Sequence, residues 1–160
     1  MQSEQEKKDL ASKLKLYEAN LPYRDHGQLT QMTQVLLEAG KYAEAEPPAR
    51  ECLALREKQI PDDWRGFNAK SMLGGSLLGR KKYAGAEPLL LSGYQGMKQR
   101  ENTIPVESKP RLKEALQRLV QLYESINRLD QAAEWKQKLE LPNGEEAERK
   151  AAATPKQPTK

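Results

Sequence analysis

The sequence predicts an all-α protein, an array of about three helix–turn–helix repeats preceded by an N-terminal helix. The stretch LLEAGKYAEAEP at residues 36–47 returns as LLGRKKYAGAEP at residues 77–88, so that Tyr42 and Tyr83 stand 41 positions apart. A looser copy, LYESINRLDQAAE, spans residues 122–134. Self-similarity at a period of a few tens of residues is typical of stacked repeats, in which each unit buries its apolar face on its neighbours.

Composition and charge narrow the classes of partner. The chain of 160 residues suits one domain, and its net charge of +4 is small and scattered, which argues against nucleic acid as a partner. No apolar run approaches the roughly 20 residues that a membrane span needs. The N-terminal residues lack the apolar core of a signal peptide. We therefore expect a cytoplasmic protein that binds neither nucleic acid nor membrane.

The chain is expected to divide into three parts. Residues 1–26 should form an N-terminal capping helix, because apolar residues recur along one helical face. Residues 27–141 should form the repeat domain. Residues 142–160 are rich in charge, alanine and proline and contain no large apolar residue, so we expect a disordered tail. The apolar face of the first helix comprises Leu10, Leu14, Tyr17 and Leu21.

Within the repeat domain, helical periodicity and end signals place six helices. Asp63 is suited to cap the third helix, and Pro110 to begin the fifth. Residues 103–106 should be an extended loop, because the residue before a proline avoids the helical conformation. The expected helices span residues 28–39, 43–59, 64–79, 84–101, 110–125 and 130–141.

The turn between the paired helices has a recurring design. The position at which the first helix closes requires a left-handed backbone, which glycine and asparagine tolerate. That position holds Gly40, Lys81 and Asn127. The residue two places later is expected to plug the angle between the paired helices, and it is Tyr42, Tyr83 and Leu129.

Three places further on, an alanine in each copy should let the paired helices approach closely. These alanines are Ala45, Ala86 and Ala132. Pro47 and Pro88 are expected in the first turn of the second helix, where the amide groups lack intrahelical partners and proline costs little.

The repeated pattern resembles the tetratricopeptide repeat, a helix–turn–helix unit. Its long spacing is similar to that of the kinesin light chain repeats, and residues 82–90 resemble C-terminal repeat regions of some bacterial serine/threonine protein kinases. The resemblance covers about residues 27–139 and implies a right-handed superhelix. The residues that carry it are Leu73, Gly74, Leu77, Tyr83 and Ala86.

In such an array the first helices of successive repeats line a concave groove, and the resemblance implies that a partner binds there. The turns of these helices that miss the core are rich in amide side chains and small residues. Amide side chains both donate and accept hydrogen bonds, so they can pair with the backbone of an extended peptide. The candidate peptide-binding residues are Gln31, Gln34, Asn68, Ser71, Gly75, Gln117, Arg118 and Gln121.

Groups that would support catalysis do not gather in the sequence. The only histidine, His26, stands beside Asp25, and a nucleophilic site there would also need Cys52. The helical phase places Cys52 on an inward face, where a free cysteine serves as small apolar filling. We therefore expect no catalytic residue, no cofactor and no metal, and hence not an enzyme.

The expected function is that of a non-catalytic protein–protein interaction module, which binds a peptide or helix of a partner in the concave groove. Two alternatives stay open at this point. One is a structural module that self-associates through its exposed repeat ends to form a homo-oligomer. The other is a regulatory C-terminal segment of a kinase-like protein.

Overall fold

The computed structural model describes Lys8 and residues 25–140 of the chain, and every regular element in residues 25–140 is helical. The predicted capping helix over residues 1–26 and the predicted tail over residues 142–160 lie almost entirely outside the described residues. The helices are α2 (His26–Glu38), α3 (Tyr42–Gln59), α4 (Trp64–Gly79), α5 (Tyr83–Gln99), α6 (Pro110–Ser125) and α7 (Leu129–Glu140). The prediction of an all-α protein is confirmed for this part of the chain.

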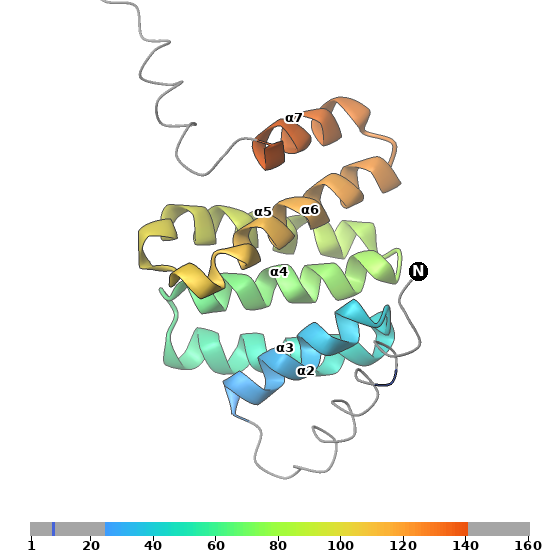
Figure 1. Ribbon diagram of the computed structural model, residues 1–160. Helices are drawn as coiled ribbons and strands as arrows, with labels where there is room; N and C mark the ends of the chain where they lie inside the picture. The colour runs from blue at the N-terminus through green and yellow to red at the C-terminus, as the bar shows by residue number, and fades with distance from the viewer. Residues whose placement is uncertain (1–7, 9–24, 141–160) are drawn as a thin grey trace, which may run out of the picture.

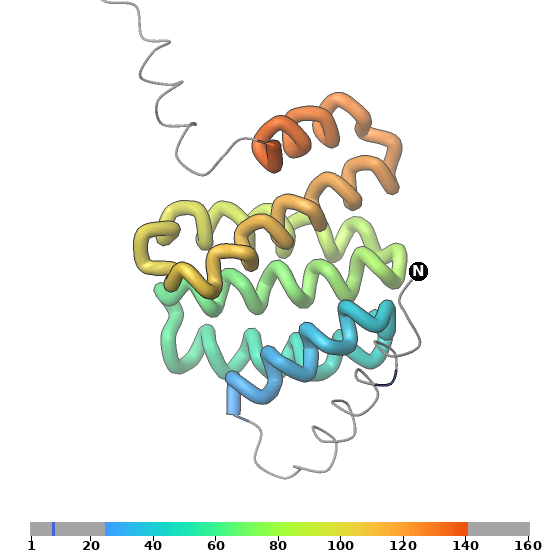
Figure 2. The backbone as a smooth tube through the Cα atoms, in the orientation of Figure 1, coloured from blue at the N-terminus to red at the C-terminus, as the bar shows by residue number. Residues whose placement is uncertain are grey.

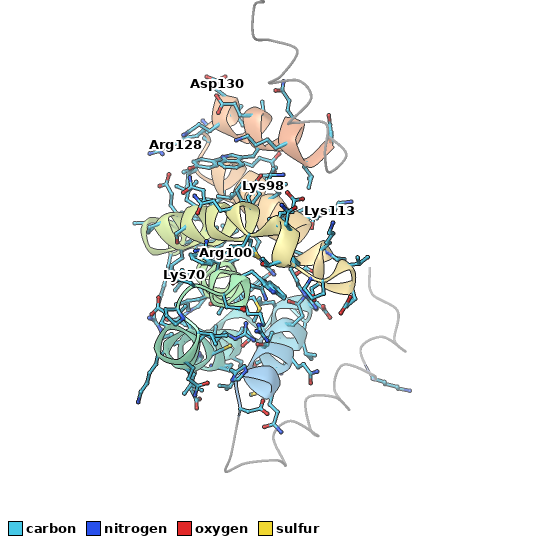
Figure 3. All side chains as sticks on the ribbon, turned by 90° about the vertical axis from the view of Figure 1, so that its left-hand side faces the viewer. Lys70, Lys98, Arg100, Lys113, Arg128 and Asp130 are labelled. Carbon is cyan, nitrogen blue, oxygen red and sulfur yellow. The ribbon has the colours of Figure 1, made fainter. Side chains whose placement is uncertain are left out.

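The helices pair into three hairpins, α2–α3, α4–α5 and α6–α7, and each hairpin packs against the next along the chain. Figure 1 shows α2, α4 and α6 nearer the viewer, with α3 and α5 behind them. Figure 3 views the same two layers from the side, with α2 and α6 on one side and α3 and α5 on the other. The tube in Figure 2 shows the hairpins stacked in chain order. Helix α4 is the central helix, because it contacts α2, α3, α5 and α6.

The three hairpin turns share one backbone conformation. Gly40, Lys81 and Asn127 lie in the left-handed region, with φ angles of 69°, 60° and 58°. In each turn the amide of this residue donates to the carbonyl three residues back, and the next amide donates to the carbonyl five residues back. This pair of bonds satisfies the last carbonyls of the first helix. The predicted closing position is therefore confirmed in all three copies.

The second helices begin one residue before their predicted starts, and the prediction that Pro47 and Pro88 lie in the first helical turn is wrong. Helices α3 and α5 begin at the tyrosine itself, because the amides of Ala45 and Ala86 already bond the carbonyls of Lys41 and Lys82, at 2.9 and 3.0 Å. The prolines of the repeated stretch therefore lie in the second turn, inside the helix. A proline there removes one intrahelical hydrogen bond rather than replacing an unpaired amide.

Two further expectations need correction. The segment before α6 is extended only at Ile104 and Pro105, because short 3₁₀ turns at Glu101–Thr103 and Val106–Ser108 flank these two residues. Leu129 does not plug the angle of its hairpin, since it remains 62% exposed. The ring of Tyr42 shows why: it lies over Gly79 of the following hairpin, and no hairpin follows α7 among the described residues.

Buried apolar side chains form one large cluster among α4, α5, α6 and α7 and two smaller clusters among α2, α3 and α4. The predicted inward face of α3 is confirmed, because Cys52 is fully buried there. Trp135 of α7 packs against the large cluster and meets the ring of Tyr94 edge to face, with ring centres 5.3 Å apart. The predicted small residues at the crossings are also buried, and they are Ala45, Ala86 and Ala132.

Helices α4 and α5 pack closely where glycine leaves room. A Cβ atom on Gly74 of α4 would lie 2.8 Å from side-chain carbons of Leu90 on α5. A Cβ atom on Gly93 of α5 would lie 2.8 Å from the backbone nitrogen of Ser71 and 2.9 Å from the backbone oxygen of Phe67. The middle hairpin is therefore held together by direct approach of its two backbones.

A glutamate near the start of each of the first two second helices joins its hairpin to the next one. The carboxylate of Glu46, 10% exposed, pairs with Arg80 and with Lys82 at 3.6 Å, both from the turn between α4 and α5. At the equivalent place, the carboxylate of Glu87 accepts a hydrogen bond from the Tyr123 hydroxyl at 3.0 Å. Burial, together with this hydrogen bond to Glu87, raises the pKa of Tyr123 to about 12. Each carboxylate thus links the second helix of one hairpin to the hairpin that follows it.

Replacing Glu46 by glutamine is expected to lower the melting temperature at neutral pH, and the loss should shrink in acid. The hydrogen bond from Arg50, helped by Arg80, holds the pKa of the Glu46 carboxyl below its usual value despite its burial. A lowered pKa in the folded state contributes stability above the unfolded pKa of about 4.3, and this contribution is lost as pH falls through the folded pKa. Thermal unfolding of both proteins, followed by circular dichroism from about pH 7 to about pH 3, measures the effect.

Glu44→Gln is the matched control, because that side chain is 56% exposed and, among the described residues, pairs only with Lys41 just before the helix, at 3.2 Å. This control should change the melting temperature little, since exposed ion pairs contribute about 0–1 kcal/mol. A difference between Glu46→Gln and the native protein that stays constant across the pH range would contradict the assigned role.

Candidate functional site

A hollow of about 320 Å³ lies among the first helices of the three hairpins, α2, α4 and α6. These are the helices that face the viewer in Figure 1. The side chain of Tyr42 from α3 also reaches the hollow, since its ring covers Gly79 of α4. The lining residues are Gln34, Leu37, Glu38, Tyr42, Gly75, Leu78, Gly79, Glu114, Gln117, Arg118 and Gln121.

Five of the eight candidate peptide-binding residues line this hollow. Gln34 comes from α2 and Gly75 from α4, while Gln117, Arg118 and Gln121 come from α6. Residues from helices more than eighty positions apart in the sequence thus meet at one place. The spacing of the candidates on successive first helices is what brings them together.

The other three candidates lie elsewhere. Gln31 is exposed on α2 but does not line the hollow. Asn68 and Ser71 are 3% and 0% exposed, so the expectation that they face an open groove is wrong. The reason is the position of α4, which contacts α2, α3, α5 and α6.

Arg118 is the central charge of the hollow. Its side chain is 14% exposed and crosses the face of Gly75, where a Cβ atom would lie 2.9 Å from the Arg118 Nε. The guanidinium donates to the Ser71 hydroxyl at 3.0 Å and lies 3.6 Å from a carboxylate oxygen of Glu114. Burial lowers the pKa of Arg118, while Glu114 and Glu38 act in the opposite direction. A guanidinium begins from so high a pKa that it keeps its charge here.

The space over the two glycines of α4 is therefore already occupied. The Arg118 side chain fills the place beside Gly75, and the Tyr42 ring fills the place beside Gly79. These glycines therefore leave no room for a ligand beside the α4 backbone. Residues of α2 and α6 line the hollow on either side of α4.

Gln34 carries an unused hydrogen-bonding atom at the edge of the hollow. Its amide nitrogen donates to the Glu38 carboxylate at 2.8 Å. A carboxylate only accepts, so the nitrogen of the amide must face Glu38 and the oxygen must point the other way. The oxygen, Oε1, is buried and has no hydrogen-bond partner among the described residues. Such an atom calls for a donor.

Sequence reasoning missed a buried arginine outside the hollow. Arg56 of α3 is 4% exposed, and its guanidinium donates to the backbone carbonyl of Arg65 at 2.5 Å and to the Thr30 hydroxyl at 2.7 Å. It therefore joins α3 to the first turns of α2 and α4. Its place one helical turn after the inward-facing Cys52 was the available signal.

The residues weighed as a nucleophilic site do not form one in the described structure. The Cys52 sulfur lies 3.5 Å from the backbone carbonyl of His26, and the fully buried thiol also contacts the Thr30 hydroxyl at 3.4 Å. Within residues 25–140 and Lys8, no three side chains of histidine, cysteine, aspartate or glutamate gather to hold a metal ion. In the same part of the chain, no helix has the length and apolar character needed to cross a bilayer.

No family model matches the chain, and no curated protein matches it.

Proposed function

We propose that the chain is a non-catalytic interaction module, a superhelical array of repeats of the tetratricopeptide type, which binds a peptide or helix of a partner protein. The observation that carries this proposal is the hollow, because three successive first helices contribute side chains to it. The identical turns of the three hairpins support the repeat assignment.

The lining of the hollow suits a peptide. Leu37, Leu78 and the ring of Tyr42 offer apolar contact, whereas Gln117 and Gln121 stand exposed on its α6 side. Peptide grooves combine polar capture of the backbone with a few apolar anchors. A single hydrogen bond from such a glutamine contributes about 0.5–1.5 kcal/mol, because water competes for both partners. Removing one amide is therefore a weak test, and filling the hollow is a stronger one.

Replacing Gln117 by tryptophan is expected to abolish peptide binding while the protein stays folded. The indole ring would occupy the open part of the hollow from an exposed position on α6. The probe is an immobilised library of random peptides of about eight residues, which in extended form span roughly 25 Å. Binding of the native chain selects the subset to be measured, and the variant should bind this subset at least about tenfold more weakly.

Gln95→Trp is the matched control, since Gln95 is exposed on α5 and does not line the hollow. It should bind the selected peptides as the native chain does. Circular dichroism must show both variants to be helical. Unchanged binding by a folded Gln117→Trp variant would overturn the hollow as the site, and failure of the native chain to bind any peptide would overturn peptide binding.

The alternative of self-association has weaker support. Among the described residues, the exposed large apolar side chains are Val106, at 79%, and Leu129, at 62%. Single exposed apolar residues are ordinary on protein surfaces, whereas an interface needs a contiguous patch.

A further inference from the structure

The hollow has more capacity to accept hydrogen bonds than to donate them. Two carboxylates, Glu38 and Glu114, line it together with one guanidinium, Arg118. The guanidinium is already engaged by the Ser71 hydroxyl and by Glu114. Each carboxylate offers about four lone-pair sites, so it can accept further bonds even when it has a partner.

The buried oxygen of Gln34 also favours a partner that donates hydrogen bonds. It belongs to a residue that lines the α2 side of the hollow, accepts no hydrogen bond from the described residues, and is part of the amide that also contacts Glu38. An incoming group that donates several hydrogen bonds would satisfy this oxygen and meet the neighbouring carboxylate at once. A neutral acceptor or an anion would leave the oxygen unpaired, which carries a desolvation penalty.

The size and walls of the hollow favour a long side chain. Its volume of about 320 Å³ stands at the small end of the range for ligand pockets. Leu37, Leu78 and the Tyr42 ring supply apolar wall. Lysine and arginine side chains pack a methylene stem on apolar surface while their charged end remains at a polar edge.

We propose that the hollow receives a basic side chain, lysine or arginine, of the partner peptide, with its charged end between the Gln34 oxygen and the Glu38 carboxylate. This inference rests on the proposed function and adds the chemical class of the partner. Glu114 pairs with Arg111 at 3.0 Å and lies 3.6 Å from Arg118, whose side chain packs against Gly75.

The test uses the full chain and five immobilised pools of peptides with random flanks. The pools differ in one fixed central residue, which is lysine, arginine, glutamine, leucine or glutamate. The lysine and arginine pools should retain about tenfold more protein than the glutamine pool, as expected for charge-assisted hydrogen bonds, and the glutamate pool should retain least. The ratio of the lysine pool to the glutamine pool should fall as salt rises, because salt screens exposed charge.

Variants then test which residues of the hollow produce the preference for a basic central residue. The double change Glu38→Gln and Glu114→Gln should bring the ratio of the lysine pool to the glutamine pool close to one. Glu51→Gln with Glu107→Gln removes the same charge from exposed positions outside the hollow and should leave the ratio unchanged. Gln34→Met removes the buried acceptor without a charge change, and it should lower the ratio severalfold, which gives a second measurement if the double variant fails to fold.

The outcomes separate this inference from the proposed function. If all five pools bind equally and Gln117→Trp abolishes this binding, the preference for a basic side chain is wrong and the proposed peptide site remains. Strongest binding of the glutamate pool would also overturn the inference, since it would assign recognition to Arg118. Failure of every pool to bind the native chain would overturn the proposed function as well.

Discussion

Replacing Leu90 by alanine is expected to lower the free energy of unfolding by about 2–5 kcal/mol, a large share of the stability of a typical domain. Leu90 is fully buried in α5, and its side-chain carbons fill the notch left by Gly74 of α4. The cost depends on how far the surroundings can collapse into the space left behind. Collapse is restricted here, because α4 and α5 already touch through their backbones at Gly93 and Ser71.

Leu129→Ala is the matched control for this substitution. Leu129 begins α7 and is 62% exposed, so its truncation leaves no cavity and should change stability by no more than about 0.5 kcal/mol. Urea unfolding followed by circular dichroism measures both variants. Similar midpoints for Leu90→Ala and Leu129→Ala would contradict the packing of the middle hairpin.

The helix bounds show how much local sequence signals can predict. The bounds of α4 and α6 agree with the sequence prediction, because Asp63 and Pro110 mark their first turns. Helix α2 begins two residues before its predicted start, because Asp25 caps it: the Asp25 carboxylate accepts from the Gln28 amide at 2.8 Å. Local end signals were thus present even where the prediction missed one.

Contacts between hairpins were beyond reach of such local signals. Tyr42 and Leu129 occupy the same place in their copies, yet one covers Gly79 of the next hairpin and the other remains exposed. The difference arises from which hairpin follows, and a pattern within one copy does not contain it. The repeated Glu46 and Glu87 were visible in the sequence, but their partners come from the succeeding turn.

The candidate site was predicted in part for the same reason. The spacing on successive first helices located Gln34, Gln117 and Gln121 at the hollow. The burial of Asn68 and Ser71 was not predictable from α4 alone, because it depends on neighbours from four other helices. A helical wheel gives the direction of a side chain, whereas burial depends on what lies in that direction.

Changing Gly93 to alanine is expected to lower the free energy of unfolding by about 1–2 kcal/mol, although alanine is the better helix former. Alanine in the middle of a helix is favoured over glycine by about 0.5–1 kcal/mol, while overpacking a tight contact costs about 1–3 kcal/mol. The added methyl group would lie 2.8 Å from the Ser71 nitrogen and 2.9 Å from the Phe67 oxygen. Both are backbone atoms of α4, so relief requires the two helices to move apart, and overpacking outweighs the gain in propensity.

Gly85→Ala should have the opposite sign. Gly85 is exposed in the same helix, and its added methyl group would lie 3.4 Å from a Leu77 side-chain carbon, an ordinary contact. Only the propensity gain of about 0.5–1 kcal/mol remains there, so this variant should be more stable than the native chain. Urea unfolding of the two variants decides the matter, because a stabilising Gly93→Ala would mean that the α4 and α5 backbones do not meet. That result would contradict the close packing of α4 against α5. The position of α4 beside the hollow depends on this packing.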